Sequence, residues 1–176
     1  MHNDVIKFCS EVKRRFPYYF VNKSVLDVGS LDINGTNRYL FTDCHYVGVD
    51  LVAGKNVDVV GAMHTLTAAS LGNKYEFDVV ICTEVLEHDI HWRSTLRALY
   101  ERTAPGGLLI ITCAGIGRPE HGTHAVSPGD SPGTNDYYRN LSARDLAEAL
   151  SPEERFFPFA IEYGGNNDLN FWGIAK

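Results

Sequence analysis

The chain has 176 residues, of which 44% are apolar and 22% charged, and this composition is typical of a globular protein rather than a disordered or fibrous one. The length predicts a single domain over 1–176. A net charge of −6 disfavours nucleic acid as a partner, because phosphate recognition needs a basic surface. No long apolar run and no basic-then-apolar leader is present, so we expect no membrane partner, no signal peptide and a cytoplasmic location.

The four cysteines are widely spaced along the chain. Cys9, Cys44, Cys82 and Cys113 form no CxxC pair, and two of them fall inside apolar runs. A structural zinc site would need closely spaced thiolate pairs, and a disulfide-stabilised fold of this size would contain more cysteines. We therefore expect reduced, mostly buried thiols, as in cytoplasmic proteins.

The first half of the chain alternates helical and extended patterns. Apolar residues at helical spacing predict an amphipathic helix over 3–16, capped by Asn3 and Asp4 and ended by Pro17. Apolar runs then predict four strands, with short helical pieces between them, over 24–29, 46–50, 57–60 and 77–82.

The second half continues the alternation. A long helix is expected from Thr83 to Tyr100 with an interruption near His91, followed by a Pro-Gly-Gly turn and a strand over 108–113. The segment 115–140, rich in Gly, Pro, Ser and His, predicts a long functional loop. Ser142 caps a helix through Leu150, and a closing pair of strands is expected over 156–163 and 169–175.

Strands that are apolar throughout need cover on both faces, and here they alternate with helices. This pattern predicts a doubly wound, mostly parallel α/β sheet. Such sheets bind ligands at the carboxyl ends of their strands. Asp27 and Gly29 close the first strand and Asp50 closes the second, about 20 residues beyond the glycine. A carboxylate at this spacing can accept from both hydroxyls of a ribose, although no GxGxxG is present.

Four sequence blocks together resemble the class I S-adenosylmethionine-dependent methyltransferases, particularly bacterial and phage-type members. They are VLDVGS at 25–30, YVGVDL at 46–51, FDVVICTEVLEH at 77–88 and APGGLLI at 104–110. The resemblance implies a three-layer α/β/α Rossmann-like sandwich whose seven-stranded sheet has the order 3-2-1-4-5-7-6 and an antiparallel last strand. It also implies a cofactor half over 24–90, a substrate-side half over 105–176, and methyl transfer that leaves S-adenosylhomocysteine.

The same resemblance assigns the cofactor contacts. The implied residues begin at the methionine part of the cofactor, continue past the ribose and adenine, and end at the opening toward the acceptor. In that order they are Asp27, Gly29, Ser30, Asp50, Leu51, Met63, Thr83 and Glu84. Two features depart from the family pattern. Leu31 replaces a usual second glycine, and no acid follows the third strand, where many relatives have one that accepts from the adenine amino group.

Acceptor-side residues are expected after the fourth and fifth strands. His88 and His121 are candidate general bases, since histidine titrates near neutral pH, although a single histidine is more often a surface or hydrogen-bonding residue. Arg118, His124 and Tyr138 are candidate substrate contacts; the competing interpretation of Tyr138 is local loop packing. The acceptor itself is expected to be a small molecule.

Three alternatives remain open at this point. On a continuous helix, Glu84, Glu87 and His88 would share one face and hold a divalent metal with His121 or His124, a pattern similar to small-RNA 2′-O-methyltransferases and some quinone O-methyltransferases. We favour no metal, because this string resembles helix-packing residues in many relatives. A non-catalytic S-adenosylmethionine-binding module is the second alternative. A nicotinamide-dependent oxidoreductase is disfavoured, since GxGxxG is missing.

Overall fold

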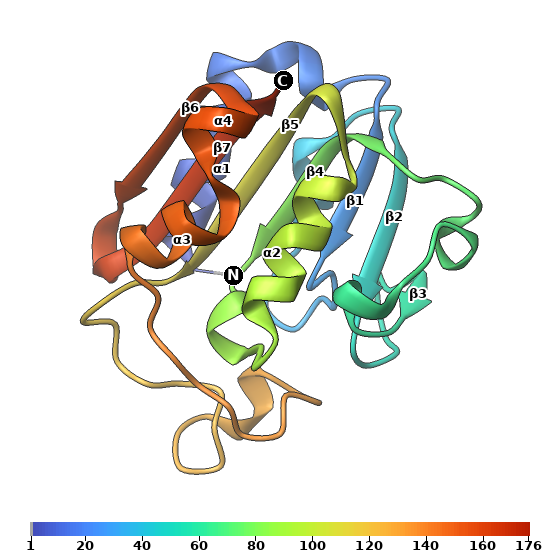
Figure 1. Ribbon diagram of the computed structural model, residues 1–176. Helices are drawn as coiled ribbons and strands as arrows, with labels where there is room; N and C mark the ends of the chain where they lie inside the picture. Colours follow the sequence, from blue (N-terminus) through green and yellow to red (C-terminus); the bar gives the residue numbers. More distant parts are fainter. Residues whose placement is uncertain (1) are drawn as a thin grey trace.

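The computed structural model describes residues 2–176, which build one seven-stranded sheet with helices on both faces (Figure 1). The strand order is β3-β2-β1-β4-β5-β7-β6, as predicted. The pairs from β3 to β5 are parallel, whereas β7 runs antiparallel to both of its neighbours. The strands are β1 (Ser24–Val28), β2 (His45–Asp50), β3 (Val59–Val60), β4 (Phe77–Thr83), β5 (Thr103–Ala114), β6 (Phe156–Tyr163) and β7 (Asp168–Ala175).

The helices form two outer layers. In Figure 1, α2, α3 and α4 lie on the near face of the sheet, and α1 lies behind it. Their bounds are α1 (Asn3–Arg15), α2 (Trp92–Glu101), α3 (Ala143–Leu150) and α4 (Pro152–Arg155). Short 3₁₀ turns fill the connections: η1 (Pro17–Phe20), η2 (Asn37–Leu40), η3 (Met63–Thr65), η4 (Ala69–Leu71), η5 (Leu86–His88), η6 (Pro128–Asp130) and η7 (Gly165–Asn167).

Strand β5 shows why the central strands are apolar at every position. Leu109 and Ile111 belong to the core cluster that includes residues of α2 and α3. Leu108 and Ile110 belong to the cluster on the other face, with residues of α1. Successive side chains of a strand point to opposite faces, so a strand covered on both sides buries every residue. The sequence pattern that predicted this strand therefore reflects two cores, one on each face.

Two predicted helix starts had different outcomes. Helix α1 begins at Asn3, but its N-cap residue is His2, which makes no side-chain capping bond, so the predicted Asn3–Asp4 cap is wrong. Asp4 instead pairs with Lys7 one turn later. Helix α3 is capped by Ser142 as predicted, in a capping box completed by Asp145.

The predicted helix from Thr83 to Tyr100 is wrong in its first part. Glu84 has a left-handed backbone (φ 58°) and donates its backbone N–H to the Thr112 carbonyl of β5. Only the short turn η5 follows, and α2 begins at Trp92 after an extended Asp89. The pairing of the chain with β5 prevents Glu84 from entering a helix. Glu84 therefore does not share a helical face with Glu87 and His88.

All four cysteines are free thiols, as predicted, and Cys9, Cys82 and Cys113 are buried. Among the described residues, none of the helices combines the length and apolarity that crossing a lipid bilayer requires.

Candidate functional site

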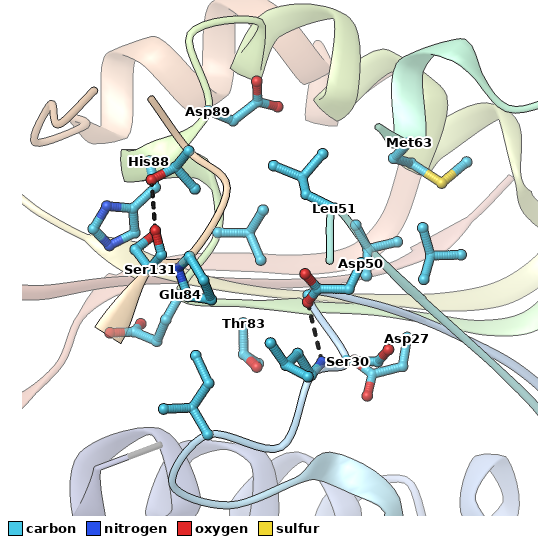
Figure 2. Close-up of a pocket in the computed structure, with 18 of the residues that line it drawn as sticks. Asp27, Ser30, Asp50, Leu51, Met63, Thr83, Glu84, His88, Asp89 and Ser131 are labelled. Atoms are coloured by element: carbon cyan, nitrogen blue, oxygen red, sulfur yellow. Dashed lines mark hydrogen bonds between the residues drawn. The ribbon is translucent and has the colours of Figure 1, made fainter. Parts of the chain in front are cut away.

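A cavity of about 160 Å³ opens at the carboxyl ends of β1, β2, β3 and β4. Figure 2 shows side chains from several of these strand ends converging on it. One part of the long loop also contributes to the wall, namely Asp130, Ser131, Pro132 and Thr134.

The turn after β1 brings backbone close to the cavity. Gly29 has φ 83°, and a Cβ at this position would lie 2.1 Å from Cγ2 of Val85. A side chain is therefore excluded both by conformation and by space. The N–H groups of Gly29 and Ser30 donate to the Val49 carbonyl at 2.9 and 3.1 Å, which ties the turn to β2.

Asp50, the last residue of β2, presents its carboxylate to the cavity (Figure 2). Oδ2 accepts from the Leu31 N–H at 3.0 Å, and Oδ1 accepts from the Val52 N–H at 3.3 Å. Each oxygen retains a further acceptor position, because a carboxylate offers about four lone-pair sites. Two oriented oxygens of this kind can receive a pair of vicinal hydroxyl groups.

Asp27 lies beneath the cavity floor and is only 1% exposed. It accepts from Asn37 Nδ2 at 3.1 Å and from the Tyr46 hydroxyl at 2.6 Å. Asn37 also donates to Thr83 Oγ1 at 3.0 Å, so one network connects the ends of β1, β2 and β4. Burial raises the pKa of Asp27 to about 6, against the opposing effect of its hydrogen bonds.

Leu51 and Met63 line the end of the cavity near β3. Gly61, Ala62 and Met63 follow β3 and contribute no acid there, as the sequence predicted. Asp89, which follows η5, contributes a carboxylate to the cavity lining.

Glu84 belongs to a cluster of charged groups at the opposite end of the cavity. It accepts from Thr112 Oγ1 at 3.0 Å and contacts His2 Nε2 at 3.1 Å, and Arg118 lies 3.8 Å away. Burial acts to raise the pKa of Glu84, but the hydrogen bond with His2 and the charges of His2 and Arg118 outweigh it and lower this pKa. Glu84 is thus held as a carboxylate.

A second cluster joins the turn η5 to the long loop. One ligand atom each from Glu87, His88 and His121 lies within 4.8 Å of the others. The Glu87 side chain is fully buried, and its Oε2 has no hydrogen-bond partner; the same holds for His88 Nδ1. Burial, reinforced by the Glu84 charge, raises the pKa of Glu87 well above its usual range, and burial lowers the pKa of His88 to about 4.

With this geometry established, sequence comparison decides the family. A family model described as a methyltransferase domain matches residues 2–148. The chain belongs to this methyltransferase family. The chain therefore also belongs to the class I S-adenosylmethionine-dependent superfamily, and its sheet has the strand order of that superfamily. No curated protein matches the sequence significantly.

Solved methyltransferase structures share the fold. The N-terminal domain of EvdMO1, crystallised in the presence of S-adenosylhomocysteine and D-fucose, is 18% identical with a TM-score of 0.66, over 99% of this chain and 84% of that one. The 1,6-didemethyltoxoflavin-N1-methyltransferase of Burkholderia thailandensis is 17% identical with a TM-score of 0.65, over 96% and 76%. Phosphoethanolamine N-methyltransferase 2 of Haemonchus contortus is 21% identical with a TM-score of 0.59, over 89% and 38%.

The structure of this methyltransferase brings all the predicted cofactor residues to the cavity, together with one of the two candidate bases. The residues that line it from this set are Asp27, Gly29, Ser30, Asp50, Leu51, Met63, Thr83, Glu84 and His88.

The remaining predicted residues lie outside the cavity lining. Arg118 pairs with the buried Asp168, and the Tyr138 hydroxyl donates to the Pro119 carbonyl at 3.0 Å. The His121 ring packs 5.0 Å from that of His88, and the exposed His124 pairs with Asp136. These contacts engage the four side chains with their own loop, with η5 or with β7.

Sequence reasoning missed Asn37, Asp89 and Thr95, which line the cavity. It predicted 115–140 to be a functional loop but did not single out the four lining residues within it, Asp130, Ser131, Pro132 and Thr134. A single sequence gives no sign that Asn37 and Thr95 belong to the site, because their neighbours depend on how distant segments of the chain pack. Asp89 had a usable signal. It is the first acid after the fourth strand that is not part of the Glu-x-x-Glu-His string.

Proposed function

We propose that the cavity binds S-adenosylmethionine and that the protein transfers its methyl group to a small-molecule acceptor, leaving S-adenosylhomocysteine. The family supplies the reaction class. The observation that carries the cofactor assignment is the pairing of the Gly29 turn with the oriented carboxylate of Asp50 across one cavity.

The proposed contacts follow the order of the strand ends. The turn at Gly29 and Ser30, organised by Asp27, would hold the methionine part. Asp50 would accept from the two ribose hydroxyls, and Leu51 and Met63 would flank the adenine. The methyl group would then face the end of the cavity where Thr83, Glu84 and His88 lie.

The sulfonium of the donor is already activated, so the protein contributes mainly by orienting the acceptor in line with the methyl group. A general base is needed when the attacking atom carries a proton. His88 is the candidate that lines the cavity. Its pKa, lowered to about 4, leaves the imidazole unprotonated at neutral pH and makes it a weaker base than an ordinary histidine, so it suits an acceptor whose own proton is acidic. His121 lies outside the cavity lining, with its ring centroid 5.0 Å from that of His88, so it would act through His88.

The acceptor class is supported by the cavity and by the charge. The cavity is concave and lies at the carboxyl ends of the strands, where sheets of this kind bind small molecules, and the net charge of −6 disfavours nucleic acid. One structural neighbour is named as the methyltransferase of a small molecule, 1,6-didemethyltoxoflavin, and another was crystallised in the presence of D-fucose. We propose that 1–176 works as one domain, with the cofactor half over 24–90 and the substrate side over 105–176. The free thiols support a reducing compartment such as the cytoplasm.

A second candidate, metal-dependent O-methylation, is favoured by one observation. Glu87 Oε2 and His88 Nδ1 are buried without partners and lie beside His121, whose Nε2 is 3.9 Å from Glu87 Oε1. Two imidazoles and a carboxylate fit Zn²⁺, Mn²⁺ or Fe²⁺ better than Mg²⁺. Such an ion would bind an acceptor oxygen and lower its pKa. Glu84, held by Thr112 and His2, is outside this set.

The test is a coupled assay for S-adenosylhomocysteine formation against fractionated metabolite pools, with chelator or with added Mn²⁺. Turnover that depends on one fraction and survives chelation supports the first candidate, and turnover that requires the ion supports the second. If S-adenosylmethionine fails to bind to the folded protein in calorimetry, both are wrong.

A further inference from the structure

We propose that Asp89 is the residue that selects adenine, by accepting a hydrogen bond from the exocyclic 6-amino group of the cofactor. This inference rests on the proposed function, because it takes the ribose to lie at Asp50. It answers a specific problem of this chain, in which the residues after β3 offer no acid to an amino group.

The position of Asp89 carries the first step. Asp89 and Met63 lie toward one side of the cavity, with Leu51 and Asp50 between them and the Thr83–Glu84 end (Figure 2). Contacts confirm that Asp89 lies close to η3. Its Oδ2 accepts from the hydroxyl of Thr95, which lies 3.4 Å from Nδ1 of His64, the residue that follows Met63. The carboxylate is thus at the cavity end where the adenine is proposed to lie.

The orientation of the carboxylate carries the second step. Oδ1 accepts from the His91 N–H at 2.7 Å, and Oδ2 accepts from Thr95. Two of its roughly four acceptor positions therefore remain available. Because the Thr95 proton is given to Asp89, the Thr95 oxygen can only accept from His64, so Nδ1 of His64 carries the hydrogen. The acid is fixed in place by neighbours that are all donors.

The chemistry carries the third step. Asp89 is half-buried, and Thr95 beside it is 1% exposed. A fixed carboxylate in such surroundings favours a ligand that presents N–H donors and disfavours one that presents a carbonyl oxygen. Adenine has an amino group at position 6, where hypoxanthine has an oxygen. Asp89 is therefore expected to discriminate between these bases, whereas Asp50 contacts only the ribose and cannot.

The experiment compares S-adenosylhomocysteine with S-inosylhomocysteine by calorimetry, using the full chain. We expect the wild type to bind the adenosyl compound about 10- to 100-fold more tightly, the cost of leaving a buried acceptor facing an oxygen. Asp89→Asn should bring this ratio to near one or invert it, since its amide can donate to the 6-oxo group. Asparagine keeps an oxygen that can accept from the His91 N–H, so the turn before α2 should still form.

Two further variants keep the outcome decisive. Asp136→Asn removes the same charge from an exposed loop position outside the cavity lining and should retain the wild-type ratio. Asp89→Ser, which keeps a short side-chain oxygen for the His91 N–H, provides the same test if Asp89→Asn does not fold. A wild-type ratio in a folded Asp89 variant overturns the inference but leaves the proposed function standing. A wild type that binds neither compound overturns both.

Discussion

At the scale of single residues, Asp50 decides whether the cavity binds a nucleoside. The N–H groups of Leu31 and Val52 orient its carboxylate. A ligand therefore does not have to overcome the entropic cost of fixing this side chain. Asp50→Asn retains an acceptor for Leu31 but loses the charge. We expect S-adenosylhomocysteine to bind about 10- to 100-fold more weakly in calorimetry. Asp43→Asn, exposed before the amino end of β2, is the matched control and should bind normally.

Asp27 provides a pH-dependent prediction at the same scale. Its pKa is raised to about 6 in the folded protein because burial penalises the charged form. In the unfolded chain an aspartate titrates near pH 3.9, so between about pH 4 and pH 6 the folded state binds more protons. The stabilising contribution of the protonated form is therefore complete below about pH 4 and is lost as the pH rises through 6.

The measurement is the difference in free energy of unfolding between wild type and Asp27→Asn across this window. We expect the wild type to lose up to about 3 kcal/mol relative to the variant from pH 4 to above pH 6, followed by a plateau. The variant keeps acceptor and shape but cannot ionise, so the difference isolates this group. A difference that stays constant with pH would show that Asp27 is not desolvated as described.

At the scale of elements, the turn after β1 combines two separable constraints. Gly29→Ala forces a side chain into a left-handed conformation and against Val85 Cγ2, 2.1 Å from the new Cβ. We expect destabilisation of about 3 kcal/mol in chemical denaturation. Gly72→Ala is the matched control, because Gly72 has φ 69° and nothing within 4 Å of its would-be Cβ. It should cost only about 1 kcal/mol. Equal losses at both positions would contradict the close approach of Val85.

The long loop provides the second prediction at this scale. The segment 130–134 lines the cavity, whereas Arg118, His121 and Tyr138, which the sequence favoured as acceptor contacts, are held within the loop or against β7. A bound cofactor would contact 130–134 directly and restrict its opening. We expect slower amide hydrogen exchange there when S-adenosylhomocysteine binds, with 124–127 as an internal reference outside the lining. Unchanged exchange at 130–134 would place the ligand elsewhere.

Features that depend on local sequence patterns were predictable, and features that depend on contacts between distant segments were not. The central strands were predictable because burial on both faces makes them apolar at nearly every position. Polar residues at or near the carboxyl ends of β1, β2 and β4 marked the cofactor half of the site. The start of α2 was not predictable, because Glu84 takes its left-handed backbone from pairing with Thr112, 28 residues away. The same limit applies to Asn37 and to 130–134, whose place at the cavity depends on how distant elements pack.

At the scale of the whole molecule, a bound metal would appear as added stability of the entire fold. An ion that binds only the native state stabilises it by about 2.7 kcal/mol at a concentration 100 times its Kd. For a chain of this size that raises Tm by roughly 5–10 °C. The candidate ligand set is Glu87, His88 and His121, because Arg118 already neutralises the second group of His2, Glu84 and Asp168. A Mn²⁺- or Zn²⁺-dependent rise in Tm should therefore vanish in His121→Ala.

Two variants distinguish this set from the one that the sequence suggested. Glu84→Gln should retain the rise, because Glu84 is bonded to Thr112 and His2 rather than to the cluster. His124→Ala should retain it too, since His124 is exposed and pairs with Asp136 in the same loop. Loss of the rise in Glu84→Gln would place the ion at a group that contains Glu84, either the predicted set or the group with His2 and Asp168. If chelated protein shows no rise with either ion, the unpaired Glu87 oxygen is accommodated by protonation, in line with its raised pKa, and methyl transfer proceeds without metal.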